Sequence, residues 1–306
     1  MRPPLQFIFQ YPDHHGVDGD MLDAGPVAEL AMATEAAGWH GFAFTEHPAP
    51  TAKWLDAGGH QSLDPFIALA HVAAVTTRLR LLTYLSVLPY RNPVLLAKSA
   101  ATVDKLSNGR FILGVGAGYL KAEFFALGVD FDERNELFDE ALDVLPLHWS
   151  GQPFDYDGKH FSCRGTIGRP QPVQQPIPIW IGGNASVTLR RVAQRAQGWM
   201  PLSGPAAMFS TVRSPEVSSV DDLVARLATL REMAGERFAD IDITCAYNDP
   251  TIHSVSHDRG HDVERHRDAI GRLHEVGATW IAVPGAAAPH PASVEFAHAF
   301  AETYVR

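Results

Sequence analysis

The chain has 306 residues, of which 46% are hydrophobic and 20% charged, and its formal net charge is −10. This length is sufficient for two ordinary domains or for one α/β barrel, which needs about 250 residues. The negative charge repels phosphate backbones and no stripe of Lys and Arg is present, so we expect no nucleic-acid partner. No apolar window reaches the ~18 residues of a membrane span, so we expect no membrane segment.

The two cysteines, Cys163 and Cys245, lie far apart and without C-x-x-C spacing. This usage is typical of a reducing compartment. The apolar run near the start, in "MRPPLQFIFQYP", is too short for a signal peptide. We therefore expect a cytoplasmic protein in which both cysteines are ordinary, partly buried residues.

Short β-rich runs alternate with helical runs along the chain, which is typical of a parallel sheet with crossover helices. Asp23 with Pro26, Asp64 and Asn92 mark helix starts, and a proline directly follows each of the last two. Gly38 marks the end of the first helix. The eight predicted strands are 5–9, 41–47, 79–89, 110–118, 177–183, 198–202, 241–247 and 279–285.

Residues 151–176 interrupt this alternation. Asp157-Gly158 lies within "PFDYDGKHFS", which predicts a hairpin with a two-residue turn. The Ser/Pro-rich stretch 203–220 is predicted to be a mobile loop. Because no repeat or long linker is present, we predict a single domain over 1–306, a (β/α)8 TIM barrel with an insertion around residues 151–176. A doubly wound sheet is the alternative fold.

The stretch "RFILGVGAGY" carries three glycines on alternate positions, Gly114, Gly116 and Gly118, and ends at Tyr119. A dinucleotide fingerprint needs a glycine at the tyrosine's position, an acid at the end of the next strand, and the first βα turn of its domain. None of these conditions holds. The pattern instead predicts a strand end where missing Cβ atoms let a flat group approach the backbone, with a plain tight turn as the alternative.

Two further strand ends carry candidate chemistry. His47, in "FTEHPAP", follows a predicted strand, and the carboxyl ends of the strands form the catalytic face of such a barrel. A histidine there can donate or accept a proton near neutral pH, or can instead be tied into loop hydrogen bonds. Gly182-Gly183-Asn184, in "IWIGGNAS", precedes a helix whose first amides suit a phosphate. The alternative is that Asn184 or Ser186 only caps that helix.

The histidines do not predict a metal site. His257, His261 and His266 lie in "HDRGHDVERH", which contains no H-E-x-x-H motif and no nearby third ligand. We expect these side chains to be solvated, and we expect no bound metal.

Three longer blocks together carry a family resemblance: "FAFTEHPAP", "LSVLPYRNPVLLAKSAATVDKLSNGRFILGVGAGYLKAEFFALGVDF" and "PIPIWIGGNASVTLRRVAQRAQGWMP". The chain resembles the superfamily of luciferase-like flavin monooxygenases and deazaflavin-dependent oxidoreductases, strongly over residues 5–205. The resemblance implies a (β/α)8 barrel, a homodimer, and FMN or coenzyme F420 lying across the carboxyl-end face.

The resemblance also implies roles for particular residues. In this family the third strand often ends in a non-prolyl cis peptide that supports the ring system, and the matching pair here is Ser86-Val87. His47 matches the histidine beside the reactive ring. The other implied cofactor contacts are Gly116, Gly118 and Tyr119 at the ring border, and Gly182, Gly183 and Asn184 at the ribityl-phosphate tail.

One departure concerns the substrate. The deazaflavin-dependent glucose-6-phosphate dehydrogenases of this family carry a proton-donating Glu where this chain has Tyr119, which argues against sugar-phosphate oxidation. The phenol can still bind substrate or cofactor through a hydrogen bond. The block pattern favours coenzyme F420, with hydride transfer to or from a small organic substrate, His47 as the proton donor or acceptor, Tyr119 as a second catalytic residue, and 203–220 as a partial lid.

Three alternatives stay open on the sequence alone. The first is an FMN-dependent monooxygenase that uses O2 and is supplied by a separate reductase. The second is a barrel that binds flavin without catalysis. The third is a metal-dependent barrel hydrolase.

Overall fold

Parallel strands close into a barrel in the computed structural model, which describes residues 4–13, 18–212, 214–257, 261–286 and 290–305. Nine strands fill eight positions, because β4 (Ser86–Val87) pairs with β5 beyond the end of β3. Pairing of β3 with β5 closes the ring. The other strands are β1 (Gln6–Gln10), β2 (Gly41–Phe44), β3 (Arg80–Thr83), β5 (Phe111–Gly116), β8 (Ile179–Gly182), β9 (Gly198–Met200), β10 (Asp242–Ala246) and β11 (Trp280–Pro284). The predicted (β/α)8 barrel is therefore confirmed over the doubly wound sheet.

Side chains alternate between two cores. In β1, Phe7 and Phe9 face outward and pack with aromatic rings of the last helix, whereas Ile8 faces the barrel axis. Almost every barrel strand contributes to the inner cluster, in which the rings of Trp180 and Trp280 meet edge-on with centroids 5.5 Å apart. The inner cluster consists of Ile8, Ala43, Leu82, Ile112, Trp180, Met200, Trp280 and Ala282. This filling makes the barrel a solid support for the groups at its end.

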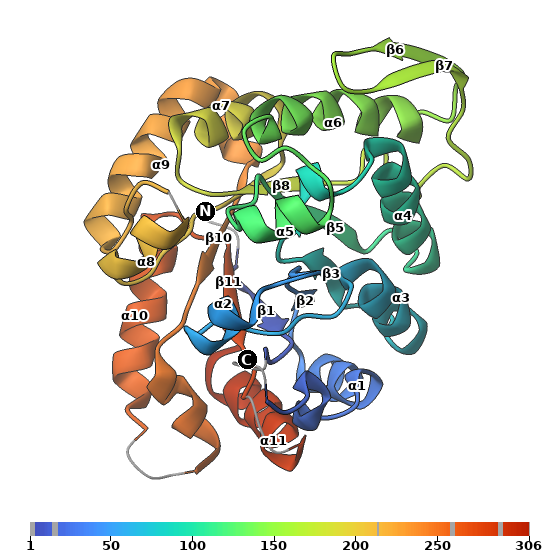
Figure 1. Ribbon diagram of the computed structural model, residues 1–306. Helices are drawn as coiled ribbons and strands as arrows, with labels where there is room; N and C mark the ends of the chain where they lie inside the picture. Colours follow the sequence, from blue (N-terminus) through green and yellow to red (C-terminus); the bar gives the residue numbers. More distant parts are fainter. Residues whose placement is uncertain (1–3, 14–17, 213, 258–260, 287–289, 306) are drawn as a thin grey trace.

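Helices surround the barrel (Figure 1). They are α1 (Val27–Ala37), α2 (Ala52–Asp56), α3 (Pro65–Val75), α4 (Pro93–Leu106), α5 (Lys121–Ala126), α6 (Arg134–Trp149), α7 (Ser186–Arg195), α8 (Ala206–Val212), α9 (Val220–Ala234), α10 (Val263–Val276) and α11 (His290–Phe300). Short turns η1 (Met21–Ala24), η2 (Leu88–Tyr90), η3 (Gly235–Asp240), η4 (Pro250–His257) and η5 (Ala301–Val305) connect or extend them. Among the described residues, no helix combines the length and apolar character needed to cross a bilayer.

The predicted helix caps are partly confirmed. Asp64 and Asn92 each accept backbone N–H bonds at the starts of α3 and α4. Asp23 does not cap α1, because it belongs to a capping box with Asp20 around η1, and α1 begins only after Pro26. A separate short turn therefore precedes the first helix.

The insertion is a two-stranded ribbon, β6 (Phe154–Asp157) paired with β7 (Ser162–Thr166), which projects beyond α6 (Figure 1). The predicted hairpin is confirmed, but 158–161 join its strands and the Gly158 N–H donates to the Phe161 carbonyl, so the turn does not lie at Asp157-Gly158. The prediction of a loop throughout 203–220 is also wrong, because it contains α8. Burial of Phe209, which is 6% exposed, gives that short helix an apolar anchor.

We predict opposite effects from adding one methyl group to two glycines. A Cβ on Gly114 would lie 2.0 Å from the carbonyl oxygen of Thr83, so Gly114→Ala should lower the free energy of unfolding by about 3 kcal/mol. A Cβ on Gly271, inside α10, would have no neighbour within 4 Å, so Gly271→Ala should raise the free energy of unfolding by about 0.5–1 kcal/mol. Denaturant unfolding of both variants measures the difference, and equal stabilities would contradict this account of Gly114.

Candidate active site

His47 lies just beyond the carboxyl end of β2, on the face where a barrel of this kind carries its chemistry. Its backbone N–H donates to Ser62 Oγ at 2.6 Å, which fixes the loop between β2 and α3. Its imidazole packs against the indole of Trp54 on α2, with ring centroids 4.5 Å apart. The side chain is 10% exposed, so the ring is held in place but reachable.

A buried carboxylate orients this imidazole. Glu123 on α5 is fully buried and lies 3.2 Å from His47 Nδ1. The same carboxylate accepts the Tyr90 hydroxyl at 2.9 Å and the Ala49 backbone N–H at 3.3 Å. Because a carboxylate oxygen accepts hydrogen bonds, Nδ1 is the nitrogen that carries the proton, and Nε2 bonds no described residue of the chain. The sequence analysis missed Glu123, although it follows Tyr119 by four residues.

Tyr119 joins the same group. Its ring stands edge-on to that of His47, with centroids 6.0 Å apart. Burial and the nearby Glu123 carboxylate raise the pKa of Tyr119 to about 12. The phenol is therefore protonated at neutral pH and can donate a hydrogen bond. The structure thus brings together the two residues predicted to be catalytic.

The non-prolyl cis peptide of this region joins Tyr84 to Leu85, so the prediction of a cis bond at Ser86-Val87 is wrong. Ser86 and Val87 instead form β4, in parallel register with Val115 and Gly116 of β5. That pairing requires extended backbone at both residues. The predicted third strand, 79–89, is interrupted at this point.

The glycines at the strand ends make room for Leu85. A Cβ on Gly116 would lie 2.5 Å from Leu85 Cδ1, and a Cβ on Gly182 would lie 2.3 Å from Leu85 Cδ2. Leu85 is partly exposed and also packs on the inner cluster of the barrel. Gly118 has φ +77°, and a Cβ there would lie 2.6 Å from Val87 Cγ1. The missing side chains therefore let the segment after β3 lie across the barrel mouth.

Glu46, another residue the sequence analysis did not single out, fixes that segment. Its carboxylate is 4% exposed and accepts the Ser86 hydroxyl at 2.8 Å and the Val87 N–H at 2.6 Å. Arg91 donates to it through Nε at 2.9 Å and also pairs with Asp64 at 2.7 Å. The Ser86 hydroxyl is thus committed to the protein itself. Two consecutive residues thus have different tasks: Glu46 binds β4, and His47 carries the imidazole.

The third predicted group lies at the end of β8. Asn184 is fully buried, and its side-chain amide donates to the carbonyls of Leu202 and Pro215 and accepts the Leu202 N–H. Helix α7 begins after Ala185 with no side-chain cap, so the alternative that Asn184 or Ser186 caps it is wrong. Gly183 has φ +111°, and a Cβ there would have Thr188 Oγ1, at 3.5 Å, as its nearest neighbour.

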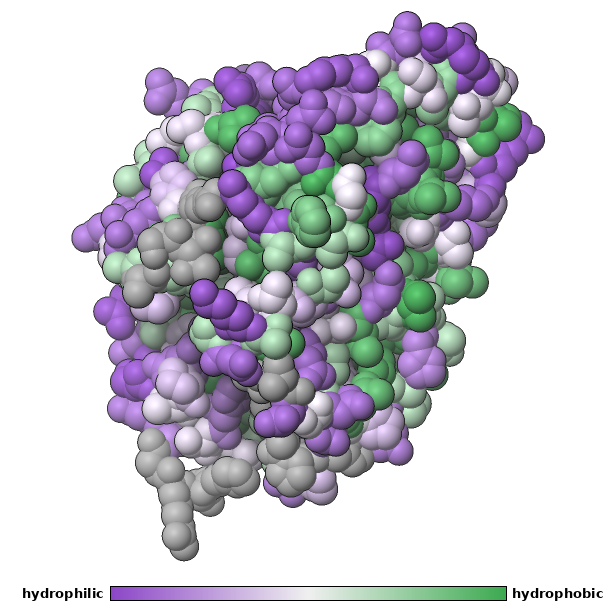
Figure 2. All heavy atoms as spheres, viewed as in Figure 1, coloured by the Kyte–Doolittle hydropathy of each residue, from purple (hydrophilic) through white to green (hydrophobic). Residues whose placement is uncertain are grey.

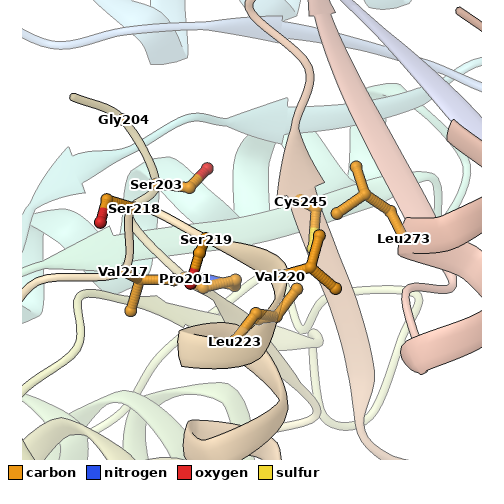
Figure 3. A pocket seen from close by; sticks show the side chains of 10 residues that line it. All are labelled: Pro201, Ser203, Gly204, Val217, Ser218, Ser219, Val220, Leu223, Cys245 and Leu273. Carbon is orange, nitrogen blue, oxygen red and sulfur yellow. The ribbon is translucent and has the colours of Figure 1, made fainter. Parts of the chain in front are cut away.

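A separate cavity of about 200 Å³ lies between the end of β9 and the start of α9 (Figure 3). Ser203, Ser219 and Leu223 line it on one side, and Cys245 of β10 lines the other. Burial raises the pKa of the Cys245 thiol to about 12, so the thiol is unreactive at neutral pH. None of the predicted site residues lines this cavity.

The ligand-type side chains elsewhere bind protein groups. His261 Nε2 and His266 Nδ1 each lie 2.6 Å from a tyrosine hydroxyl, of Tyr304 and Tyr247 respectively, and the two imidazoles stack on each other. The prediction that these two rings are solvated is wrong for His266, which is fully buried. The side chain of His257 lies outside the described residues.

Glu133, Glu136 and His160 also bring ligand atoms within 4.8 Å of one another. The ammonium of Lys159 already pairs with both of these carboxylates, at 3.3 and 2.6 Å.

We predict that removing the Glu46 carboxylate destabilises the protein. Glu46→Ala leaves the Val87 N–H and the Arg91 guanidinium without their buried acceptor, which should lower the free energy of unfolding by about 3 kcal/mol. Glu232→Ala, at an exposed position of α9, is the matched control and should change it by less than about 0.5 kcal/mol. Urea unfolding measures both, and similar values for the two would contradict the role given to Glu46.

Comparison with known proteins matches the family described as luciferase-like monooxygenase to residues 6–248. An uncharacterised protein of Mycobacterium tuberculosis, Rv0940c, is 32% identical over 268 residues, 83% of each chain. An F420-dependent glucose-6-phosphate dehydrogenase of Gordonia bronchialis is 30% identical over 197 residues, 61% of this chain and 56% of that one.

Solved structures agree in fold. The monooxygenase RslO1 from Streptomyces bottropensis superposes with a TM-score of 0.79 and 20% identity, over 98% of this chain and 99% of its own. The coenzyme F420-dependent tetrahydromethanopterin reductase from Methanopyrus kandleri gives a TM-score of 0.72 and 16% identity, over 99% of both chains. The site geometry, the barrel and the matched residues lead to one conclusion: this chain belongs to the luciferase-like monooxygenase family and is an oxidoreductase of the flavin- or deazaflavin-dependent kind.

Proposed function

We propose that this chain is an F420-dependent oxidoreductase that acts on a small organic substrate. The observation that carries the proposal is the His47–Glu123 pair, whose free Nε2 lies at the carboxyl end of β2 beside the barrel mouth. When bound, the deazaflavin supplies a two-electron hydride acceptor or donor, and the protein supplies orientation and proton transfer. The 30% identity to an F420-dependent dehydrogenase favours F420 over FMN.

The residues at the barrel mouth fit a flat ring. Leu85 presents a partly exposed apolar side chain over Gly116 and Gly182. The rings of His47 and Tyr119 contact each other beyond the carboxyl ends of β2 and β5. We assign Ser86, Val87, Gly116 and Gly118 to the support beneath the ring, since their packing fixes Leu85. His47 and Tyr119 are the polar side chains that we assign to contact with the ring.

The start of α7 fits a phosphate. No side chain caps the amides of its first turn. A Cβ built on Gly183 would have no neighbour closer than Thr188 Oγ1, at 3.5 Å, so the space beside this glycine is open. Unpaired amides at a helix N-terminus favour an anion. The Gly183 N–H donates to the Met200 carbonyl and the Gly183 carbonyl accepts the Trp199 Nε1–H, so these backbone groups are already bonded. We assign Gly182 and Gly183 to the phosphate tail because they carry no side chain that would fill the space beside α7. We assign Asn184 an indirect role, because its side chain does not contact the phosphate but holds Leu202 and Pro215 beside this turn through hydrogen bonds.

His47 serves as the acid–base group in this proposal. With Nδ1 donating to Glu123, Nε2 accepts the proton of a substrate hydroxyl as that substrate is oxidised, or returns it during reduction. The Glu123 carboxylate stabilises the imidazolium that forms. Tyr119 donates a hydrogen bond from its protonated phenol to the substrate or the cofactor. The segment 203–220, with α8, is assigned as a partial lid.

An FMN-dependent monooxygenase supplied by a separate reductase is the second candidate. It is supported by the family description and by the likeness in fold to the monooxygenase RslO1. The same residues would hold either ring, so the cofactor decides between the two functions. The cytoplasm remains the proposed location.

We also propose a homodimer. Hydrophobic side chains gather over α3 and α4 at the right of Figure 2. Ile67 on α3 is 74% exposed and Leu95 on α4 is 68% exposed. A groove of about 490 Å³ adjoins Ile67, with Leu22 and Leu63 among the apolar residues that line it. Exposed apolar surface of this kind is typical of an interface between subunits.

The cofactor assignment predicts that oxidised F420 binds the purified protein more tightly than FMN does. Titration with each cofactor, followed by absorbance and fluorescence, measures the two dissociation constants. Tight binding of FMN alone would support the monooxygenase instead. Binding of neither cofactor would overturn both candidates.

The role of His47 predicts separate effects on turnover and binding. His47→Ala should lower turnover roughly 10²–10⁴-fold, the usual contribution of a positioned acid–base group, while the cofactor dissociation constant stays within about threefold. His298→Ala, at an exposed position of α11, is the control. Unchanged turnover in the His47 variant would remove it from the mechanism.

The dimer predicts that a charge at the apolar surface separates the subunits. Ile67→Glu should convert the protein to a monomer in sedimentation equilibrium, because it would bury an unpaired carboxylate in the interface. Met233→Glu places the same charge on α9, where the side chain is 45% exposed, and should leave the dimer intact. A monomeric unaltered protein would contradict the proposal outright.

A further inference from the structure

A second imidazole lies directly against that of His47. The ring of His60 stands edge-on to the His47 ring, with centroids 4.9 Å apart and an interplanar angle of 82°. The indole of Trp54 contacts both rings, with centroid distances of 4.5 Å to His47 and 5.6 Å to His60. The His60 side chain is 19% exposed, about twice the exposure of His47. Of the two rings, His60 has the better access to solvent.

His60 has its own carboxylate. Its Nδ1 lies 3.6 Å from Asp13 Oδ2 and 3.1 Å from the carbonyl oxygen of Gln61. A carbonyl oxygen only accepts hydrogen bonds, so Nδ1 carries the proton in the neutral ring and Nε2 is the basic atom. Asp13 is held in turn by the side chains of Gln10, at 2.7 Å, and Thr45, at 3.2 Å. This arrangement repeats the His47–Glu123 pair with a different loop.

We propose that His47 and His60 form a coupled pair that holds one proton between them, and that His60 passes this proton to solvent. The proposal rests on the acid–base role given to His47 above. Two imidazolium ions with ring centroids this close repel each other, so protonation of one ring disfavours protonation of the other.

Charged and titratable groups face both rings. Glu123 and Tyr119 face His47, and Asp13 faces His60. Glu46, the chain neighbour of His47, is already paired with Arg91. The carboxylate beside each ring favours an imidazolium there, but it does not remove the repulsion between two of them. The pair therefore takes up its first added proton more readily than its second.

The pair completes the proton balance of the reaction. When a substrate alcohol is oxidised, its C–H bond breaks and the electron pair leaves with the hydrogen as hydride to the oxidised deazaflavin. Its O–H bond breaks as the carbonyl forms, and the proton goes to His47 Nε2. His47 returns to its neutral form by giving the proton to a water molecule, from which His60, the more exposed ring, accepts it before releasing it to solvent. Reduction of a carbonyl substrate runs the same steps in reverse.

Ring-proton NMR of the histidines over a pH series tests the coupling without any added cofactor. His47→Gln and His60→Gln assign the two signals and isolate each ring. In the unaltered protein the two rings should protonate in separate steps. The ring that protonates second should gain about 1 unit in pKa when its partner is replaced, because the repulsion is then absent. His298→Gln, at an exposed position of α11, should move neither signal.

Asp13→Asn provides an independent arm that keeps both imidazoles. It removes the anion beside His60 and should lower the pKa of His60. If His60→Gln does not fold, as judged by circular dichroism, this variant and His47→Gln carry the test. A shift below about 0.2 units in the remaining ring of each folded histidine variant would overturn the coupling, whatever Asp13→Asn shows. Coupling without binding of F420 or FMN would instead refute the proposed function and leave the histidine pair standing.

Discussion

A buried carboxylate must find hydrogen-bond donors, and this constraint at Glu46 and Glu123 organises the whole candidate site. Glu46 collects donors from β4 and Arg91, and Glu123 collects donors from His47, Tyr90 and the backbone of Ala49. Each carboxylate joins segments that are 33 to 76 positions apart in sequence. The ends of β2, β3 and β5 are therefore locked to one another before any cofactor or substrate enters. This arrangement fixes the His47 ring beyond the carboxyl end of β2, with Nδ1 held by Glu123.

The glycines illustrate how backbone and side chain share the same space. Gly116 and Gly182 come from different strands, yet both lack a Cβ where Leu85 would meet it. A leucine placed across a barrel mouth needs two neighbouring strand ends without side chains. The apolar face that results belongs to the segment after β3, and the glycine-rich strand is only its support. A tight turn alone does not account for these glycines.

The barrel could be predicted from the sequence because the patterns that indicate it lie within short stretches of the chain. Alternating strand and helix runs, Asp64 and Asn92 at helix starts, and the break at 151–176 are all contained in short windows. His47 and Tyr119 could be predicted because each follows a strand at the catalytic end. Glu123 could not, since its pairing with His47 depends on how α5 packs over the barrel. The cis bond could not be located either, because only the pairing of β4 with β5 fixes which residues are extended.

The amide of Asn184 has a consequence for how this protein can change. Its side-chain amide forms hydrogen bonds with the backbone of Leu202 and of Pro215, so both ends of the intervening segment are bound to the turn after β8. Loop closure is the main entropic cost of a longer or different segment, and here the closure is enforced from outside the segment. The exposed positions Pro205 and Ala206 can then be exchanged or lengthened at little cost to the barrel, whereas the buried Phe209, together with Ser214, whose hydroxyl accepts the Asn184 N–H, holds the segment in place. Substitutions at these exposed positions therefore change the surface beside the barrel mouth without disturbing Asn184 or the hydrogen bonds around His47.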